Sequence, residues 1–88
     1  MKPKEGLVAS KIGEELILVP IGEAAQEMHG IVRLNDTGGF IWNGISEGLD
    51  ERQIAKRLTE EYSGVDFDGA LKQVQSMIAR LTEAGLLV

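Results

Sequence analysis

Apolar and polar residues follow the two-residue period of β-strands in the first part of the chain. Runs of this kind cover residues 7–12 (LVASKI) and 14–21 (EELILVPI), and Gly13 between them suits a hairpin turn. Pro20 cannot donate to a strand ladder, so we expect it at a strand end or on an edge. The next segment, residues 22–27 (GEAAQE), is only one or two helical turns long, and we interpret it as a loop.

A third strand is predicted over residues 29–34 (HGIVRL). The alternation of side chains along a strand directs Ile31 and Arg33 to one face of the sheet and Val32 and Leu34 to the other. Three short strands of this kind form a small antiparallel sheet with at least one open edge.

From residue 35 onward the period changes from two to 3.6, which indicates helices. Asn35 or Asp36 can accept hydrogen bonds from the first turn of a helix that extends to about Ser46. Gly38 and Gly39 each cost up to ~1 kcal/mol inside a helix relative to alanine, so we expect a close approach of the helix to neighbouring backbone there. The inner face is predicted to carry Phe40, Ile41 and Ile45.

Two further helices follow. Asp50 and Gln53 form a capping-box pair that opens the second helix, and Gly64 is placed to end it in a left-handed conformation. The third helix begins at Asp66 or Asp68. Its apolar stripe consists of Leu71, Val74, Met77, Ile78 and Leu81.

Strands that precede helices in this way predict an α+β domain in which the helices pack on one face of the sheet. At 88 residues the chain is one domain, which we place over residues 7–88 after a flexible N-terminal segment, residues 1–6. A domain of this size buries only about 60% of the surface that its unfolded chain exposes, which favours a surface groove over a deep active site.

The composition narrows the classes of function. The 14 acidic residues outnumber the 9 basic ones and give a net charge of −5, which argues against nucleic-acid binding as the main task. The chain has no cysteine, so disulfides, thiolate metal sites and cysteine nucleophiles are excluded. The longest apolar run is far shorter than the ~20 residues of a membrane span, and there is no secretory signal pattern. We therefore expect a soluble, cytoplasmic protein that does not bind a membrane.

Candidate catalytic residues are few. The single histidine, His29, has no nucleophile or second histidine near it in sequence, and we interpret it as a polar residue at a strand start. Asp66 and Asp68 have a metal-like spacing, but capping of the third helix explains them more simply. The pair Gly38-Gly39 lacks the lysine and the further glycines of a phosphate loop. We predict no catalytic residue, no metal site and no cofactor.

The predicted sheet edge next to a helix is a template for an added strand from another chain. Backbone pairing would supply affinity, and an apolar slot between strand and helix would select the guest's alternate side chains. The alternative is an edge that solvent or a second copy of the chain covers, and the pattern alone favours this alternative.

Three sequence runs indicate a resemblance to a known family. They are "RLNDTGGFIW", "EGLDERQIAKRLTEEYSGVD" and "MIARLTEAGLL". In order and spacing they make residues 7–88 resemble the coenzyme PQQ synthesis protein D family, also called PqqD-like proteins or RiPP recognition elements. This resemblance implies a small winged helix-turn-helix-like fold of three strands and three helices without catalytic activity. It also implies binding of the leader segment of a ribosomally made precursor peptide and its presentation to a modifying enzyme, a radical-SAM protein in the namesake case.

The resemblance also implies where the leader binds. It pairs as an extra strand against the third strand, here residues 29–34, and lies beside the third helix, here about residues 67–84, which favours an open edge over a covered one. Backbone pairing is then expected from Gly30, Ile31, Val32, Arg33 and Leu34. The apolar slot is expected from Leu71, Val74, Gln75 and Ile78. Lys72 and Arg80 are expected to meet an acidic leader residue.

Two other functions stay open at this point. A winged-helix nucleic-acid-binding regulator needs a basic recognition helix, yet residues 66–84 carry three acidic and two basic side chains, a net charge of −1. A structural subunit would instead form a homodimer that buries its own sheet edge.

Overall fold

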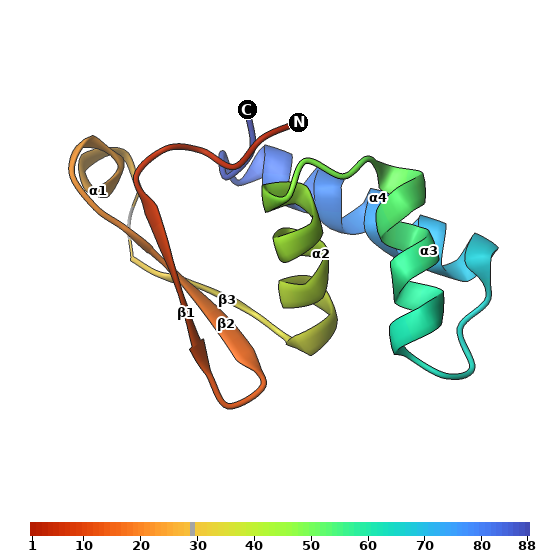
Figure 1. Cartoon of the computed structure of the whole chain (residues 1–88). Helices are drawn as coiled ribbons and strands as arrows, with labels where there is room; N and C mark the ends of the chain where they lie inside the picture. Colours follow the sequence, from red (N-terminus) through yellow and green to blue (C-terminus); the bar gives the residue numbers. More distant parts are fainter. Residues whose placement is uncertain (29) are drawn as a thin grey trace.

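The computed structural model describes residues 1–28 and 30–88. A small sheet lies at one end of the molecule and three helices lie at the other, as Figure 1 shows. In chain order the elements are β1 (Leu7–Ile12), β2 (Glu15–Pro20), α1 (Glu23–Glu27), β3 (Val32–Leu34), α2 (Asp36–Ser46), α3 (Glu51–Glu61) and α4 (Phe67–Glu83). The predicted α+β class, with a three-stranded antiparallel sheet before the main helices, is confirmed.

The sheet has the order β1-β2-β3, and both pairings are antiparallel. Gly13 takes a φ of 63° in the turn between β1 and β2, a conformation that glycine adopts without steric cost. Leu7 pairs with Pro20 and Leu16 pairs with Leu34. The predicted hairpin is therefore confirmed, and Pro20 lies at a strand end.

The third strand is shorter than predicted. The expected range was residues 29–34, but only Val32–Leu34 pair with β2. Gly30 has a φ of 88°, which is incompatible with an extended strand, and Ile31 is 51% exposed just after it. Gly30 and Ile31 therefore lie before the strand, and His29 lies outside the described residues.

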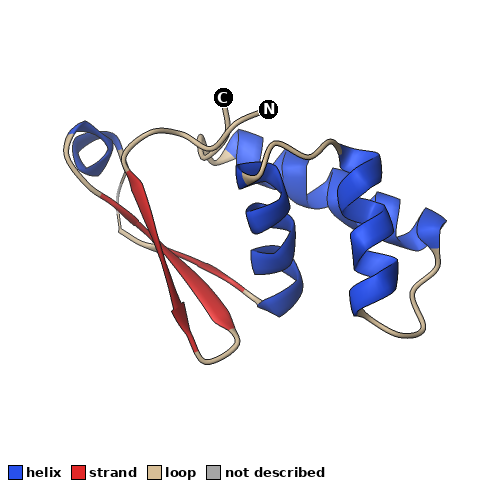
Figure 2. Cartoon of the chain, viewed as in Figure 1, coloured by secondary structure: helices blue, strands red, loops and turns tan. Residues whose placement is uncertain are grey.

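The interpretation of residues 22–27 as a loop was wrong, because α1 (Glu23–Glu27) occupies them (Figure 2). Ala24 is buried. A Cβ placed on Gly6 would lie only 2.9 Å from the Cβ of Ala24, so Ala24 packs closely against Gly6. A single helical turn is unstable alone, so this packing of Ala24 stabilises it. The sequence gives no local signal of that contact.

The three longer helices begin as the capping residues predict, and the structure decides between the alternatives. Asn35 caps α2, since its Oδ1 accepts a hydrogen bond from the Gly38 backbone N–H at 2.8 Å. Asp66 caps α4 through the Gly69 N–H at 2.7 Å. The capping box between Asp50 and Gln53 is present at the start of α3.

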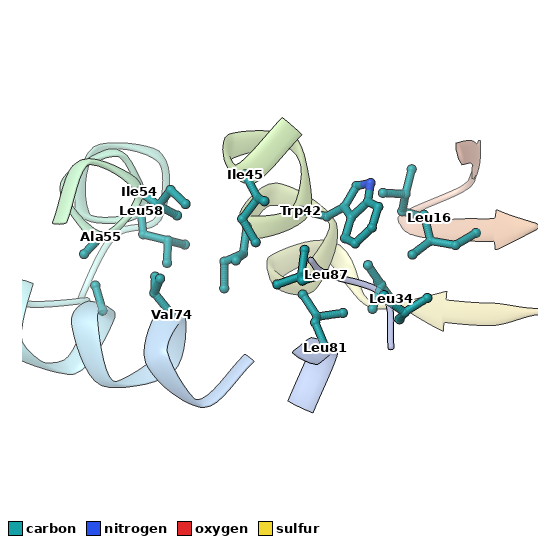
Figure 3. Close-up of a cluster of buried hydrophobic side chains, with 14 residues drawn as sticks. Leu16, Leu34, Trp42, Ile45, Ile54, Ala55, Leu58, Val74, Leu81 and Leu87 are labelled. Atoms are coloured by element: carbon teal, nitrogen blue, oxygen red, sulfur yellow. The ribbon is translucent and has the colours of Figure 1, made fainter. Parts of the chain in front are cut away.

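One hydrophobic core joins the sheet to the helices, and Figure 3 shows its two ends. At the sheet end Trp42 of α2 lies against Leu16, and at the helical end Val74 of α4 faces Leu58 of α3. A Cβ on Gly44 would lie only 2.8 Å from Ile54 Cγ1, so glycine permits the close contact of α2 with α3.

The two chain ends pair with each other and lie side by side in Figure 1. Lys2 N–H donates to the Val88 carbonyl at 2.9 Å, Val88 N–H donates to Lys2 at 2.8 Å, and Lys4 N–H donates to Leu86 at 2.8 Å. The prediction of a flexible segment over residues 1–6 did not anticipate these bonds. They hold the C-terminal end so that Leu86 and Leu87 are buried.

Candidate functional site: the groove between β3 and α4

β3 offers an open edge. It pairs with β2 on one side, and in the part of the chain that the structure describes no strand pairs with its other side. Val32 is half-buried, Arg33 is exposed and Leu34 is buried. The outward backbone groups of this short strand are therefore free for a guest strand.

A groove of about 440 Å³ runs between β3 and α4. Its lining comes from β3, the N-cap of α2, the C-terminal half of α4 and the segment after it, with one residue from the start of β2. These residues are Glu15, Val32, Arg33, Leu34, Asn35, Met77, Arg80, Leu81, Ala84 and Leu86. We call this hollow the β3 groove.

The β3 groove has an apolar floor and polar rims. Leu34, Leu81 and Leu86 are 7%, 3% and 1% exposed, so they form its floor. Val32 and Met77 are half-buried and form its walls. Because the floor is part of the core, the groove exists before any peptide binds.

A second hollow of about 390 Å³ adjoins the β3 groove, and Asn35, Met77 and Arg80 line both. It lies between the first turns of α2 and the middle of α4, and we call it the α2 groove. Its lining is Asn35, Thr37, Ile41, Lys72, Gln73, Ser76, Met77 and Arg80. The two hollows together form a continuous track along one flank of α4.

The structure brings five of the predicted site residues to this track: Val32, Arg33, Leu34, Lys72 and Arg80. The described lining of the track does not include the other six predicted residues. These are Gly30, Ile31 and the four predicted slot residues Leu71, Val74, Gln75 and Ile78.

The four slot residues occupy the opposite flank of α4. Val74 is fully buried beneath α3 (Figure 3), and Gln75 Nε2 donates to Glu51 Oε2 of α3 at 3.2 Å. Leu71 and Ile78 are half-buried and pack against the core. This flank is therefore filled by the chain's own side chains.

Met77, Leu81, Ala84 and Leu86 line the groove but were not predicted as site residues. Positions 77, 81 and 84 follow the three- and four-residue spacing of one helix side, so the sequence did hold a signal for them. Leu86 has a local signal too, because Gly85 takes a φ of 77° at the end of α4 and the Leu86 N–H donates to the Leu81 carbonyl at 2.9 Å. The pairing of the chain ends adds a second hydrogen bond, from the Lys4 N–H to the Leu86 carbonyl.

Glycines in α2 let this helix approach the groove. A Cβ on Gly38 would lie 3.0 Å from Met77 Cε and 3.4 Å from Leu34 Cβ, and one on Gly39 would lie 3.1 Å from Leu16 Cβ. The expected close approach is present, but it is to side chains and not to neighbouring backbone. Because Gly38 has no side chain, the side chain of the wall residue Met77 can pack directly against α2.

A polar contact joins the start of α2 to the end of α3, at a hollow distinct from the two grooves. The Tyr62 hydroxyl donates to Asp36 Oδ2 at 2.7 Å, and its ring meets Phe40 edge-on with 5.8 Å between centroids. Burial of the hydroxyl, and next its hydrogen bond to Asp36, raise the pKa of Tyr62 to about 12. This contact ties two helices together.

Within residues 1–28 and 30–88, no three His, Cys, Asp or Glu side chains gather as a metal site requires. Across the same residues, no helix is both long enough and apolar enough to cross a bilayer.

Residues 15–87 match the family model described as coenzyme PQQ synthesis protein D (PqqD). Two solved structures share the fold, and each is superimposed on 99% of this chain with a TM-score of 0.81. One is TbiB1 in complex with the TbiA(beta) leader peptide, 24% identical over 94% of that chain. The other is lasso peptide synthetase B1 complexed with the leader peptide, 20% identical over 95% of that chain. No curated protein matches the sequence.

Proposed function

We propose that this chain, which belongs to the coenzyme PQQ synthesis protein D family, binds the leader segment of a ribosomally made precursor peptide and catalyses no reaction itself. The observation that carries the proposal is the open edge of β3 beside a preformed apolar groove. The two structures with the same fold are complexes with leader peptides, which supports the same mode of binding here.

The mechanism is strand addition. A leader segment pairs with the backbone of Val32–Leu34, and every second side chain then points from the new strand towards the floor formed by Leu34, Leu81 and Leu86. Backbone pairing gives affinity with little dependence on sequence. The apolar floor gives selectivity for leaders with apolar residues at alternate positions.

Binding of this kind positions a precursor for another protein. We place the chain in the cytoplasm as the recognition partner of a modifying enzyme, of the radical-SAM type in PQQ synthesis or a related pathway. The modification of the peptide is carried out by that enzyme, because the proposed role of this chain ends with capture and presentation of the peptide.

The proposal is tested by titration of isotope-labelled protein with a synthetic leader, taken from a short precursor encoded beside this chain's gene. Amide shifts are expected at residues 32–35, 77, 80, 81, 84 and 86, with a dissociation constant in the nanomolar to low micromolar range. Amides of α3, which faces away from the groove, should not shift. Saturable shifts confined to α3 or to β1 would place the peptide elsewhere and contradict the proposal.

The two alternatives are tested with the same sample. A regulator would bind duplex DNA with an affinity that falls steeply with salt concentration. A homodimer that buries the edge of β3 would show a mass that rises with protein concentration and would compete with the leader.

A further inference from the structure

The two grooves carry positive charge although the chain as a whole is acidic. Arg33, Lys72 and Arg80 line them, and Glu15 is the one carboxylate among their described lining residues. The chain has a net charge of −5. The track along α4 is therefore of opposite sign to the protein that carries it.

The cations of α4 form no ion pair with the described carboxylates. Among the described carboxylates, none lies within 4.0 Å of the charged groups of Lys72 or Arg80. Among the described cations outside the grooves, two are paired, Lys4 with Glu27 and Arg57 with Glu47 at 3.2 Å. The other four have no carboxylate within 4.0 Å, so the charge of the grooves rests on the excess of cations in their lining. In the grooves only Arg33 has a partner, Glu15 at 4.0 Å, and both side chains are more than half exposed.

These two cations lie on one side of α4: Arg80 lines both grooves, and Lys72 lines the α2 groove alone. Lys72 and Arg80 are eight residues apart, so about 12 Å of helix axis separates them. The α2 groove includes Asn35, which follows Leu34, but no residue of β3. A strand paired with β3 therefore leaves the apolar floor at the Leu34 end and enters the α2 groove.

We propose that the peptide bound by this chain carries Asp or Glu residues on the flank that enters the α2 groove, where Lys72 and Arg80 recognise their carboxylates. The inference rests on the proposed strand addition and adds the chemical class of the ligand. A guest strand antiparallel to β3 begins at the Leu34 end, so its acidic residues lie N-terminal to its apolar ones. A parallel guest has them C-terminal.

The test uses the full 88-residue chain and a displayed library of random 12-residue peptides. Peptides are selected on the unaltered protein, on Lys72→Gln/Arg80→Gln and on Lys56→Gln/Arg57→Gln. The last variant makes the same change in net charge on α3, outside both grooves. Circular dichroism and thermal unfolding establish that each variant is folded before selection.

The unaltered protein is expected to enrich peptides with alternating apolar residues and an acidic flank on one fixed side. The acidic flank should disappear from selection on Lys72→Gln/Arg80→Gln and persist on Lys56→Gln/Arg57→Gln. For one enriched peptide, replacement of each acidic residue by its amide should weaken binding about two- to fivefold, as expected for a partly exposed charged contact. This loss should shrink at high salt.

The remaining outcomes separate the two proposals. The charge recognition would be overturned if the enriched peptides had no acidic residues. It would also be overturned if selection on both double variants kept the acidic flank, or if selection on both lost it. Each of these results would leave strand addition intact. Failure to enrich any peptide, or enriched peptides whose amide shifts avoid residues 32–35, would overturn the proposed function itself.

Discussion

The two flanks of α4 share one helix and differ in what covers them. One flank presents Val74 and Gln75 to α3, which fills the space with its own side chains. The other presents Met77 and Arg80 to the β3 groove and the α2 groove, which no described residue fills. The first flank stabilises the domain, and the second is available to a ligand.

This difference explains why the apolar stripe of α4 does not coincide with the residues that line the two grooves. Hydrophobic periodicity marks the residues that a helix buries in its own domain. A groove that is open to water in the free protein is lined by a mixture of apolar and polar side chains, so its flank looks ordinary in the sequence. Val74 is the strongest member of the stripe and is the residue least accessible to a peptide.

The largest expected effect separates the flanks by stability. Val74→Asp buries an unpaired carboxylate where the side chain has no exposure, so it should lower the free energy of unfolding by roughly 3–5 kcal/mol. Denaturant unfolding followed by circular dichroism measures the change. The matched variant Ser76→Asp adds the same charge two positions later on the exposed flank and should change stability by less than about 0.5 kcal/mol. Equal losses would show that the flanks do not differ.

Removal of residues 1–4 should have an intermediate effect on both properties. It deletes the hydrogen bonds that hold Leu86 and Val88, each worth about 0.5–1.5 kcal/mol, so stability should fall by about 2 kcal/mol. Leader affinity should fall as well, because Leu86 is part of the groove floor. Thermal unfolding and calorimetric titration with the leader measure the two changes. Unchanged affinity would mean that Leu86 is held in place without the pairing.

Met77→Ala should act mainly on binding. Loss of the groove wall is expected to weaken leader affinity about tenfold, or about 1.4 kcal/mol, at a stability cost below about 2 kcal/mol. Leu71→Ala is the control, since Leu71 is also half-buried but lies outside the groove. It should lower stability with little change in affinity. The opposite result, affinity lost in Leu71→Ala alone, would move the site to the α3 flank.

The smallest effect is a titration of Tyr62, which lines neither groove. Folding raises the pKa of Tyr62 from 10.0 to about 12, so the stabilisation from this shift is present below pH 10 and is lost as pH rises through 12. Tyr62 is the chain's single tyrosine, so tyrosinate absorbance reports on it alone. Asp36→Asn should lower this pKa only in part, because burial is the larger cause.

Met77→Ala serves as the control for that titration. It removes a groove side chain and should leave the pKa of Tyr62 at about 12, because Tyr62 does not line either groove. A shifted midpoint would show that the groove flank and the α3 flank are coupled.

Much of the fold was predictable, because its signals are local. The hairpin at Gly13, the caps at Asn35 and Asp66 and the capping box at Asp50 each depend on residues within a few positions. The alanines and glutamates of Glu23–Glu27 favour helix, but this helix was missed because one turn is too short to be stable alone. The burial of Ala24 stabilises it. The winged-helix likeness stays a prediction.

The candidate site was predictable in its elements but only in part in its residues. The resemblance named the third strand and the last helix, and these are the elements that form the β3 groove. Five of the predicted residues, Val32, Arg33, Leu34, Lys72 and Arg80, line the two grooves. Their role in peptide binding stays a prediction, as does that of the acidic leader residue.

The sequence by itself determined the first hairpin, the starts of the three longer helices, which family the chain resembles and how the charges balance, since periodicity, capping and composition act over short distances. Tertiary structure alone decided which flank of α4 faces α3 and which faces the groove. An amphipathic helix can rotate by one residue with a small change in pattern, so contacts with distant elements fix its orientation. Leu86 shows both influences. Its N–H donates to the Leu81 carbonyl at 2.9 Å within the local end of α4, and residues 2–4, at the other end of the chain, pair with the segment that carries it.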